Sequence, residues 1–358
     1  MINKILIFVA LFNICSVSHA SLAKNRGYTF RTFDVPGAVE TYATNTNSRG
    51  QVAGHFYDGS HYFGYLFSNN GFMQLDTPSS VDIEAISVNN NGILAGQYFE
   101  NGHLSAFIYK AGRFTPINNP KNPNDHLWFT NIDGSGQVSG YYGSPPYFHG
   151  FTYLNGNFST VDVPNATSTM INDVNTGGQV AGSYFDTYIP NLTGHAFVLN
   201  KDGVKTFDAP GATSTGFISI NAKGQIIGNY NDSSFASHGF IYNDGNVIYV
   251  DVPNATSTTL LDNNDNGQVI GFYIDNAGIY RSFVYSDSTF TTINVPGSVS
   301  RSDIIGTYIN TINACGQLTG QFIDNSLHTH GFVAYPNHSK KKGCQKGKRN
   351  DNDDDVTD

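Results

Sequence analysis

Short strand-like runs that contain both apolar and polar residues recur along the repeated part of the chain. Runs such as residues 149–153 and 179–184 are bounded by Asn, Asp, Gly or Pro. This is the pattern of strands joined by turns. Charged residues make up only 13% of the chain, and no window shows a sustained 3.6-residue apolar stripe with helix-forming neighbours. The sequence therefore predicts an all-β protein.

The strand-like runs repeat as one unit in seven copies, with a period of about forty residues, which is typical of propellers and arrays. Each unit contains four predicted strands. Strand a ends at an Asn-x-x-Gly turn, strand b is a Gln-Val-x-Gly-x-Tyr segment, strand c carries His-Gly-Phe, and strand d leads to Asp-x-Pro. Residues 208–242 show the strand-d ending, the turn, strand b and strand c in one stretch.

Two glycines recur in every unit. One closes the turn between strands a and b, where a positive φ permits a tight hairpin. The other follows four residues later, inside strand b, where we expect a bulge or a close approach at which one sheet packs on its neighbour. The turn glycines are Gly50, Gly92, Gly136, Gly178, Gly224, Gly267 and Gly316, and the strand glycines are Gly54, Gly96, Gly140, Gly182, Gly228, Gly271 and Gly320.

The incomplete units at the two ends of the repeat region predict that the repeats close into a ring. Residues 28–34 form a strand d with no strands a to c before it, and residues 331–335 form a strand c with no strand d after it. Pairing them completes the seventh unit and leaves no free sheet edge. We therefore expect a seven-bladed β-propeller of four-stranded antiparallel blades. An open β-array would leave these incomplete units unexplained, and two separate sandwiches would leave the uniform period unexplained.

The repeat resembles the bacterial extracellular HAF-repeat family. The resemblance rests on Asp-Val-Pro-Gly-Ala, Ile-Asn-x-x-Gly-Gln-Val-x-Gly-x-Tyr and His-Gly-Phe motifs, with His195-Ala196-Phe197 as a variant, and it covers residues 28–335. It implies an exported repeat protein and supplies no activity. The chain departs from the pattern where Phe63, Leu104 and Tyr280 take the place expected for the strand-c His, and where Asn118 and Asn294 replace the Asp before Pro.

The two ends of the chain differ from the repeats. Residues 1–20 are typical of a signal peptide, with Lys4 before an apolar run and Ser18-His19-Ala20 as the cleavage site. The run is too short to cross a bilayer, so we predict a secreted or periplasmic protein without stable membrane insertion. Residues 21–27 form a short N-terminal segment, residues 28–336 the propeller, and residues 337–358 a disordered charged tail.

Charge and cysteine content narrow the choice of partners. The formal net charge of -9 argues against nucleic acid as a ligand. Of three cysteines, Cys15 leaves with the signal peptide. Cys315 and Cys344 either form a disulfide in an oxidising compartment or stay as two thiols, and their spacing does not decide between these. The sequence does not specify an oligomeric state.

The sequence predicts no catalytic centre, metal site or cofactor. The strand-c histidines His149, His195, His238 and His330 recur with Asp34, Asp162, Asp208 and Asp251. An active site needs its catalytic residues only once, whereas residues that hold the fold together recur in each blade. We therefore expect each His to form a hydrogen bond within its own blade. Residues 262–267 match the first half of a calcium loop, but Tyr273 stands where a bidentate Glu is required. A hairpin turn explains them better.

Differences in loop length point to a binding face. The connection before strand a is longest in units three and seven, and the b-to-c connection is longest in unit four. All of these emerge on one face, and variable loops on a rigid scaffold commonly carry binding sites. The candidate ligand-binding residues on this face are Asp125, His126, Trp128, Asp186, Tyr188, Asn191, Arg301, Asp303 and Tyr308.

These features favour a binding module for an extracellular glycan or protein. Trp128, the only tryptophan, would stack on a sugar ring, although a lone Trp in such a protein also suits buried packing. One alternative is a hydrolase or lyase at the mouth of the channel, using Asp125, His126, Arg301 and Asp303. Another is a structural surface protein without a ligand.

Overall fold

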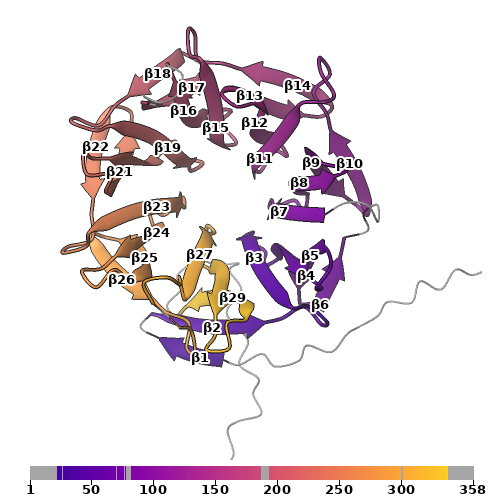
Figure 1. Ribbon diagram of the computed structural model, residues 1–358, viewed down its shortest axis with the longest axis vertical. Coiled ribbons are helices and arrows are strands. Elements are labelled where there is room, and N and C mark those ends of the chain that lie inside the picture. Colours follow the sequence, from indigo (N-terminus) through magenta and orange to yellow (C-terminus); the bar gives the residue numbers. More distant parts are fainter. Residues whose placement is uncertain are drawn as a thin grey trace, which may run out of the picture.

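The computed structural model describes residues 22–25, 27–69, 71–75, 77, 82–186, 193–299 and 301–337. Within these ranges the chain forms seven antiparallel sheets arranged as blades around a central channel, and no helix (Figure 1). The predicted seven-bladed, all-β propeller is therefore confirmed. In the first blade β3 (Glu40–Thr46) lines the channel, followed outward by β4 (Val52–Tyr57), β5 (Tyr62–Ser68) and β6 (Gly71–Gln74).

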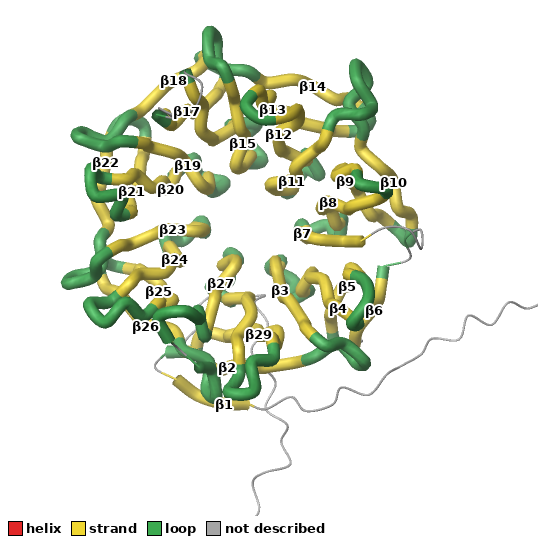
Figure 2. Tube along the Cα trace, in the orientation of Figure 1, coloured by secondary structure: helices red, strands yellow, loops and turns green. Residues whose placement is uncertain are grey.

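The next five blades repeat this order from the channel to the rim, and loops or turns join their strands (Figure 2). Their strands are β7 (Asp82–Val88), β8 (Leu94–Glu100), β9 (His103–Lys110) and β10 (Arg113–Ile117); β11 (His126–Ile132), β12 (Val138–Ser144), β13 (Tyr147–Leu154) and β14 (Asn157–Val161); β15 (Ser168–Val174), β16 (Val180–Phe185), β17 (Gly194–Asn200) and β18 (Gly203–Phe207); β19 (Ser214–Ile220), β20 (Ile226–Asn231), β21 (Ser237–Asn243) and β22 (Asn246–Val250); and β23 (Ser257–Asn263), β24 (Val269–Ile274), β25 (Tyr280–Ser286) and β26 (Thr289–Ile293).

The seventh blade joins the two ends of the repeat. It contains β27 (Thr307–Ile312), β28 (Leu318–Ile323) and β29 (Thr329–Pro336), and β2 (Tyr28–Phe33) pairs with β29 in a register that sets Phe33 opposite Gly331. The predicted closure is thus present. The sequence did not predict β1 (Leu22–Asn25), which pairs with β2 and gives this blade a fifth strand.

The hydrophobic core lies between neighbouring blades. One cluster, for example, joins Ala95 and Ala106 of the second blade to Leu127 and Phe151 of the third. The close approach between blades occurs at the glycine of the His-Gly-Phe motif. A Cβ on Gly150 would come within 2.8 Å of the Ile171 side chain in the next blade, which is closer than real Cβ atoms approach.

The strand-b glycine makes a close approach inside its own blade, which corrects our expectation of a contact between sheets. A Cβ on Gly182 would lie 2.2 Å from the Met170 carbonyl oxygen and 2.9 Å from the Phe197 ring, both in the same blade. The inner strand carries a β-bulge directly opposite, between Ile171 and Asp173. Bulges re-aim side chains, and this one precedes the residues that line the channel.

Candidate functional site

The disc has two chemically different faces. The b-to-c and d-to-a connections meet at one face, as in the first blade, where the Val39 N–H donates to the Tyr57 carbonyl at 2.7 Å. We call this the loop face. The a-to-b and c-to-d turns form the opposite face, which we call the turn face. Of the candidate residues predicted from loop length, Asp125, His126, Trp128, Asp186, Arg301, Asp303 and Tyr308 are described, and they lie at or next to the loop face.

In the third blade, Asp125, His126 and Trp128 are held by neighbours. The Asp125 carboxylate accepts hydrogen bonds from the amides of Asn119 and Asn122, at 2.8 and 2.6 Å. The His126 Nδ1 accepts the Leu104 N–H at 3.1 Å. The Trp128 indole is half-buried and stacks on Tyr141 with ring centroids 5.3 Å apart. One face of the indole is thus occupied by protein.

The other candidates form separate local groups. Asp186 lies 3.5 Å from His195, the exposed Arg301 and Asp303 form an ion pair at 3.4 Å, and Tyr308 packs against Phe272. No hydrogen bond or ion pair between described residues joins the candidates of one blade to those of another. Tyr188, Asn191 and Cys344 lie outside the described residues. The binding roles and the Cys315–Cys344 disulfide therefore stay predictions.

The strand-c histidines bond within their own blades, as expected. Nδ1 of each donates to the Asp that follows strand d: His149 to Asp162 at 2.9 Å, His195 to Asp208 at 3.0 Å, His238 to Asp251 at 3.1 Å and His330 to Asp34 at 2.8 Å. His330 and Asp34 come from opposite ends of the repeat region, so this pair also stabilises the closed ring. The hydrogen bond to Asp34 raises the pKa of His330.

Strand register corrects two of the assigned exceptions to this pattern. The residue paired with the strand-b aromatic residue is His in four blades, opposite Tyr142, Tyr184, Tyr230 and Phe322, but it is Ser105 in the second blade and Arg281 in the sixth. The repeat pattern predicts Leu104 and Tyr280 at this position, one residue too early in each blade. Arg281 donates to Asp275 at 2.7 Å, so a guanidinium group occupies the position that an imidazole takes in four other blades.

The loop face exposes large apolar side chains in several blades. These are Val39, Phe235 and Leu327 in b-to-c or d-to-a connections, and Phe99 and Tyr147 at the strand ends next to such connections. Phe235 is the most exposed of them, at 82%. The other exposed large apolar side chains of the described residues, Met73, Ile248 and Tyr249, lie on the outer strands β6 and β22.

Two of these apolar residues occupy turn positions that favour glycine. Phe235 and Leu327 have φ of 64° and 66°, in turns where their N–H bonds the carbonyl three residues earlier. The equivalent turn of the sixth blade has the same hydrogen bonds, with Gly278 at φ 75°. A bulky residue in the left-handed region is strained, and such strain gathers at functional sites. No packing explains these two side chains, because both project into solvent.

The loop face is also strongly acidic. Its basic residues among those described are Lys121, Arg281 and Arg301. Its carboxylates are Asp34, Glu40, Asp58, Asp82, Glu100, Asp125, Asp162, Asp186, Asp208, Asp232, Asp251, Asp275, Asp303 and Asp324. On the turn face the two charges are balanced, with Arg49, Lys110, Arg113, Lys201, Lys205 and Lys223 against Asp133, Asp202, Asp244, Asp265 and Asp287. The two faces therefore differ in charge.

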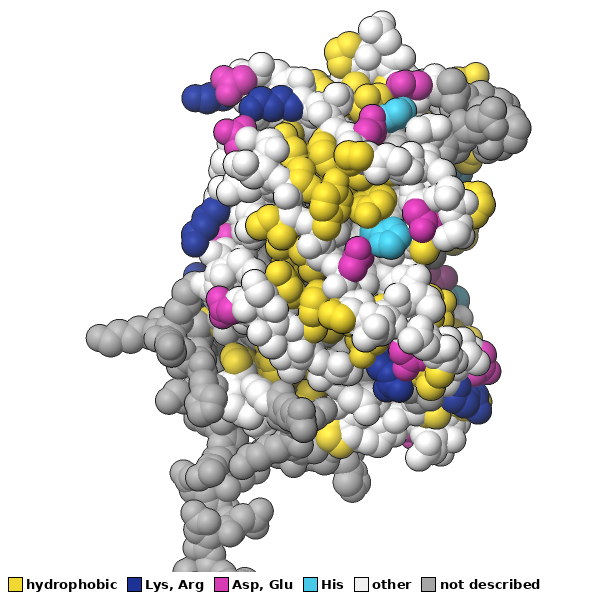
Figure 3. All heavy atoms as spheres, turned by 90° about the vertical axis from the view of Figure 1, so that its left-hand side faces the viewer, with side chains coloured by type: hydrophobic (Ala, Val, Ile, Leu, Met, Phe, Trp, Pro, Cys, Tyr) yellow, Lys and Arg dark blue, Asp and Glu magenta, His cyan; other side chains and the backbone are white. Residues whose placement is uncertain are grey.

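An edge-on view of the disc agrees with this distribution. Lys and Arg side chains lie along the left edge and, beside carboxylates, at the lower right, whereas histidines flanked by carboxylates lie toward the right (Figure 3). Between the two edges runs a band of apolar side chains, which belongs to the rim of the disc.

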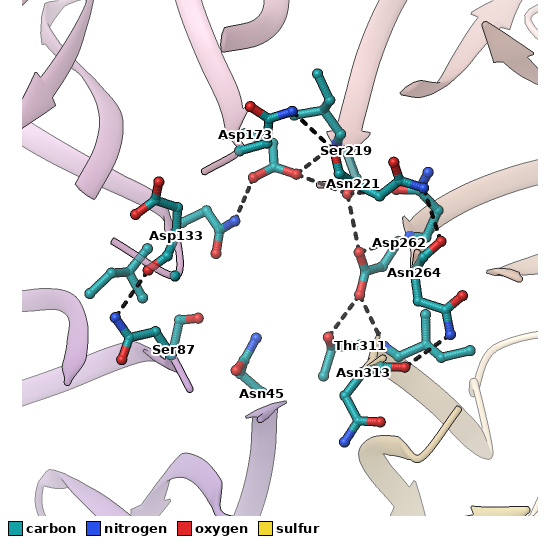
Figure 4. A pocket seen from close by; sticks show the side chains of 18 of the residues that line it. Asn45, Ser87, Asp133, Asp173, Ser219, Asn221, Asp262, Asn264, Thr311 and Asn313 are labelled. Carbon is teal, nitrogen blue, oxygen red and sulfur yellow. Dashed lines mark hydrogen bonds between the residues drawn. The ribbon is translucent and has the colours of Figure 1, made fainter. Parts of the chain in front are cut away.

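The channel contains a polar cavity of about 480 Å³ near the turn face. All seven inner strands contribute to its wall through their last residues and the a-to-b turns (Figure 4). Asp262, from the calcium-like segment, points into this wall, while Gly267 N–H bonds Asn264 O in a hairpin turn as predicted. The candidates derived from loop length do not line this cavity.

The turn asparagines form a ladder of hydrogen bonds around the channel. Each amide Nδ2 donates to the backbone carbonyl of the equivalent residue in the next blade: Asn47 to Asn89, Asn89 to Asp133, Asn175 to Asn221, Asn221 to Asn264, Asn264 to Asn313 and Asn313 to Asn47, at 2.9 to 3.0 Å. The third blade interrupts the ladder because Asp133 has no amide to donate. The repeated Asn therefore links neighbouring blades through hydrogen bonds.

Two residues before the turn, the inner strand carries a polar side chain in every blade: Asn45, Ser87, Asn131, Asp173, Ser219, Asp262 and Thr311. Asp173 Oδ2 accepts the Ile220 N–H of the next blade at 2.8 Å, and Asp262 Oδ2 accepts the Ile312 N–H at 2.9 Å. Figure 4 shows this chain of bonds along one side of the cavity, with Asn45 and Ser87 across from it.

A single hydroxyl group bridges the two buried carboxyl groups. The Ser219 Oγ lies 2.9 Å from Asp173 Oδ2 and 3.1 Å from Asp262 Oδ1, yet a hydroxyl has one hydrogen to donate. Both contacts are hydrogen bonds only when a carboxyl group holds a proton. Burial raises the pKa of Asp173 to about 6 and also raises the pKa of Asp262, which favours such protonation.

Sequence reasoning missed this ring of polar residues. The signal was present, because the residue two positions before the turn Asn or Asp is polar in all seven units. Among the described residues, no group of three or more His, Cys, Asp or Glu side chains is arranged to hold a metal ion, and no helix long and apolar enough to span a membrane occurs.

No family model and no curated protein matches the chain. Solved structures match its fold. Virginiamycin B lyase from Staphylococcus aureus aligns over 86% of this chain and 99% of its own, with 10% identity and a TM-score of 0.55. A streptogramin B lyase gives 13% identity and 0.55 over 87% and 99%. The β-propeller domain of the Pyrococcus furiosus trilobed protease gives 8% identity and 0.56 over 85% and 99%. Identities this low establish the propeller fold alone, and membership of the HAF-repeat family stays a prediction.

Proposed function

We propose that the protein is an exported binding module whose loop face recognises an extracellular protein or glycan. One observation supports this most directly: the loop face places Phe235 and Leu327 in water at strained turn positions where Gly278 shows that glycine suffices. Apolar side chains exposed at such a cost in free energy are typical of contact surfaces. The turn face instead repeats one structural device, the asparagine ladder.

The matching folds include lyases and peptidase domains, which keeps the enzyme alternative open as a prediction. The residues nominated for it, Asp125, His126, Arg301 and Asp303, engage local partners. The carboxyl groups of the channel form hydrogen bonds with neighbouring blades through both oxygens. These bonds support a role in holding the ring, and so we favour binding.

A binding screen tests the proposal. The purified protein is presented to glycan arrays and to panels of extracellular proteins, beside a Phe235→Gly/Leu327→Gly variant. We expect a ligand whose binding the variant weakens at least about tenfold, the effect of removing two apolar contacts. Trp128→Ala tests the stacking hypothesis separately. A ligand bound equally well by wild type and by the Phe235 and Leu327 variant would place the binding surface elsewhere.

A further inference from the structure

The exposed apolar residues of the loop face stand next to fixed carboxylates. Phe235 follows Asp232 in one turn, and Leu327 follows Asp324 in the equivalent turn of the seventh blade. Asp232 Oδ1 accepts the N–H groups of Ser234 and Ala236 at 2.8 and 3.0 Å. The turn that projects the phenyl ring therefore also fixes the position of the carboxylate.

These carboxylates are ionised over a wide pH range. A hydrogen bond from the Ser234 hydroxyl lowers the pKa of Asp232 to about 2, and the His328 N–H lowers the pKa of Asp324. Each apolar side chain is thus presented three residues from a carboxylate whose ionised form is stabilised by its turn. Oδ2 of each carboxylate also lies 3.4 Å from a histidine Nε2 of the same blade, His238 or His330. A ligand that complements both groups has an apolar surface beside a cation.

The net negative charge of the loop face also favours a ligand that carries cations. Carboxylates crowd the loop face and basic residues gather on the turn face, so the negative potential is one-sided. Such a field attracts and orients a cationic partner and repels polyanions. A neutral sugar offers hydroxyls to carboxylates but gains nothing from the net potential, and it has little apolar surface for Phe235 and Leu327.

We propose that the loop face docks a basic polypeptide segment in which Lys or Arg alternates with apolar residues. The apolar side chains pack on Phe235, Leu327 and Tyr147, and the cations lie against carboxylates such as Asp232 and Asp324. This inference rests on the proposed function, because it assumes that the loop face is the binding surface. It adds the chemical class of the partner.

Selection from a displayed library of random peptides tests this class directly. The purified protein is the target, and the Phe235→Gly/Leu327→Gly protein serves for counter-selection. Gly278 shows that the same turn forms with glycine, so the double substitution keeps the fold, which a Tm no lower than that of the wild type verifies. We expect the enriched peptides to combine net positive charge with Leu, Phe, Trp or Tyr. Enrichment of neutral or acidic peptides, or equal recovery of basic peptides on the wild-type and substituted proteins, would overturn the inference.

An enriched peptide then permits two sharper measurements. Its affinity should fall about tenfold between about 50 and about 300 mM NaCl, because salt screens exposed charges. Substitution of its Lys and Arg by Glu should abolish binding. Ile248→Thr is the matched control, since Ile248 is exposed at 58% but lies on the rim, and it should leave the affinity unchanged. An affinity that is insensitive to both salt and charge reversal would exclude a basic partner.

A glycan array run in parallel separates this inference from the proposed function. A glycan bound by wild type and lost in the Phe235 and Leu327 variant, with no basic peptide selected, would retain the loop face as a binding surface and reject the polypeptide partner. If the variant changes neither peptide nor glycan binding, both proposals fail.

Discussion

The two ends of the same inner strands follow different rules. At the turn face each strand finishes in a nearly invariant Asn whose amide reaches the next blade. At the loop face the equivalent positions differ from blade to blade, and the surface carries exposed apolar groups and most of the carboxylates. What repeats holds the ring together, and what varies forms the surface for which we propose a role in recognition. The following predictions test this division.

The largest effect is expected at the turn asparagines. Asn221→Ala removes the donor to Asn264 O and the acceptor for the Lys223 and Gln225 N–H groups, and all three bonds are at least partly buried. We expect a loss of about 3 kcal/mol in the free energy of unfolding, measured by urea titration. Asn221→Asp keeps the acceptor and should cost less. If Asn221→Ala lowers the free energy of unfolding no more than Asn221→Asp does, the hydrogen bonds from the Lys223 and Gln225 N–H groups contribute nothing to stability.

The buried carboxyl groups should make stability depend on pH. The pKa of Asp173 rises from 3.8 to about 6 on folding, so the folded state holds more protons between these values and stability falls as pH increases through this window. We expect roughly 2 to 3 kcal/mol of this loss to disappear in Asp173→Asn. Urea titrations of both proteins at several pH values between about 4 and 7 measure it. Parallel pH profiles would show that the carboxyl group titrates normally.

A smaller effect, a gain in stability, is expected at Asp133, where the asparagine ladder is interrupted. Asp133→Asn supplies an amide that can reach the Asn175 carbonyl, while its Oδ1 keeps the acceptor role toward Ser135 and Gln137. We expect about 1 kcal/mol of added stability, read as an increase in Tm. Asp265→Asn is a control on the same face outside the ladder. A decrease in Tm in Asp133→Asn would show that the gap serves another purpose.

The smallest effect concerns the closure pair. Because the pKa of His330 is raised, the ion pair with Asp34 contributes its full stability below the unfolded value of 6.5 and loses it as pH rises through the folded pKa. Both side chains are partly exposed, so we expect less than about 1 kcal/mol. Asp34→Asn should lower Tm at pH 6 and hardly at pH 9. The same decrease at both values would indicate a neutral hydrogen bond.

The sequence by itself determined the closed ring. Seven copies of one unit and the lone strand d before the first of them require β2 to pair with β29, because otherwise two sheet edges stay open. It also determined the turns, since Asn-x-x-Gly specifies a hairpin through local backbone preferences. Loop length then indicated the face on which to look for binding. All of these inferences depend on sequence patterns that are either local or repeated along the chain.

Only the tertiary structure decided which groups meet between blades. The amide of Asn221 bonds Asn264, and Asp173 meets Ser219, across more than forty residues. These contacts are set by the curvature of the ring and by a bulge that turns the polar residue toward the channel. The strand-b glycine and the polar position recur in every unit, but neither pattern tells which residue of the next blade the side chain meets. The exposure of Phe235 was equally hidden, because a phenylalanine in a β-protein predicts burial until its turn is seen to project it outward.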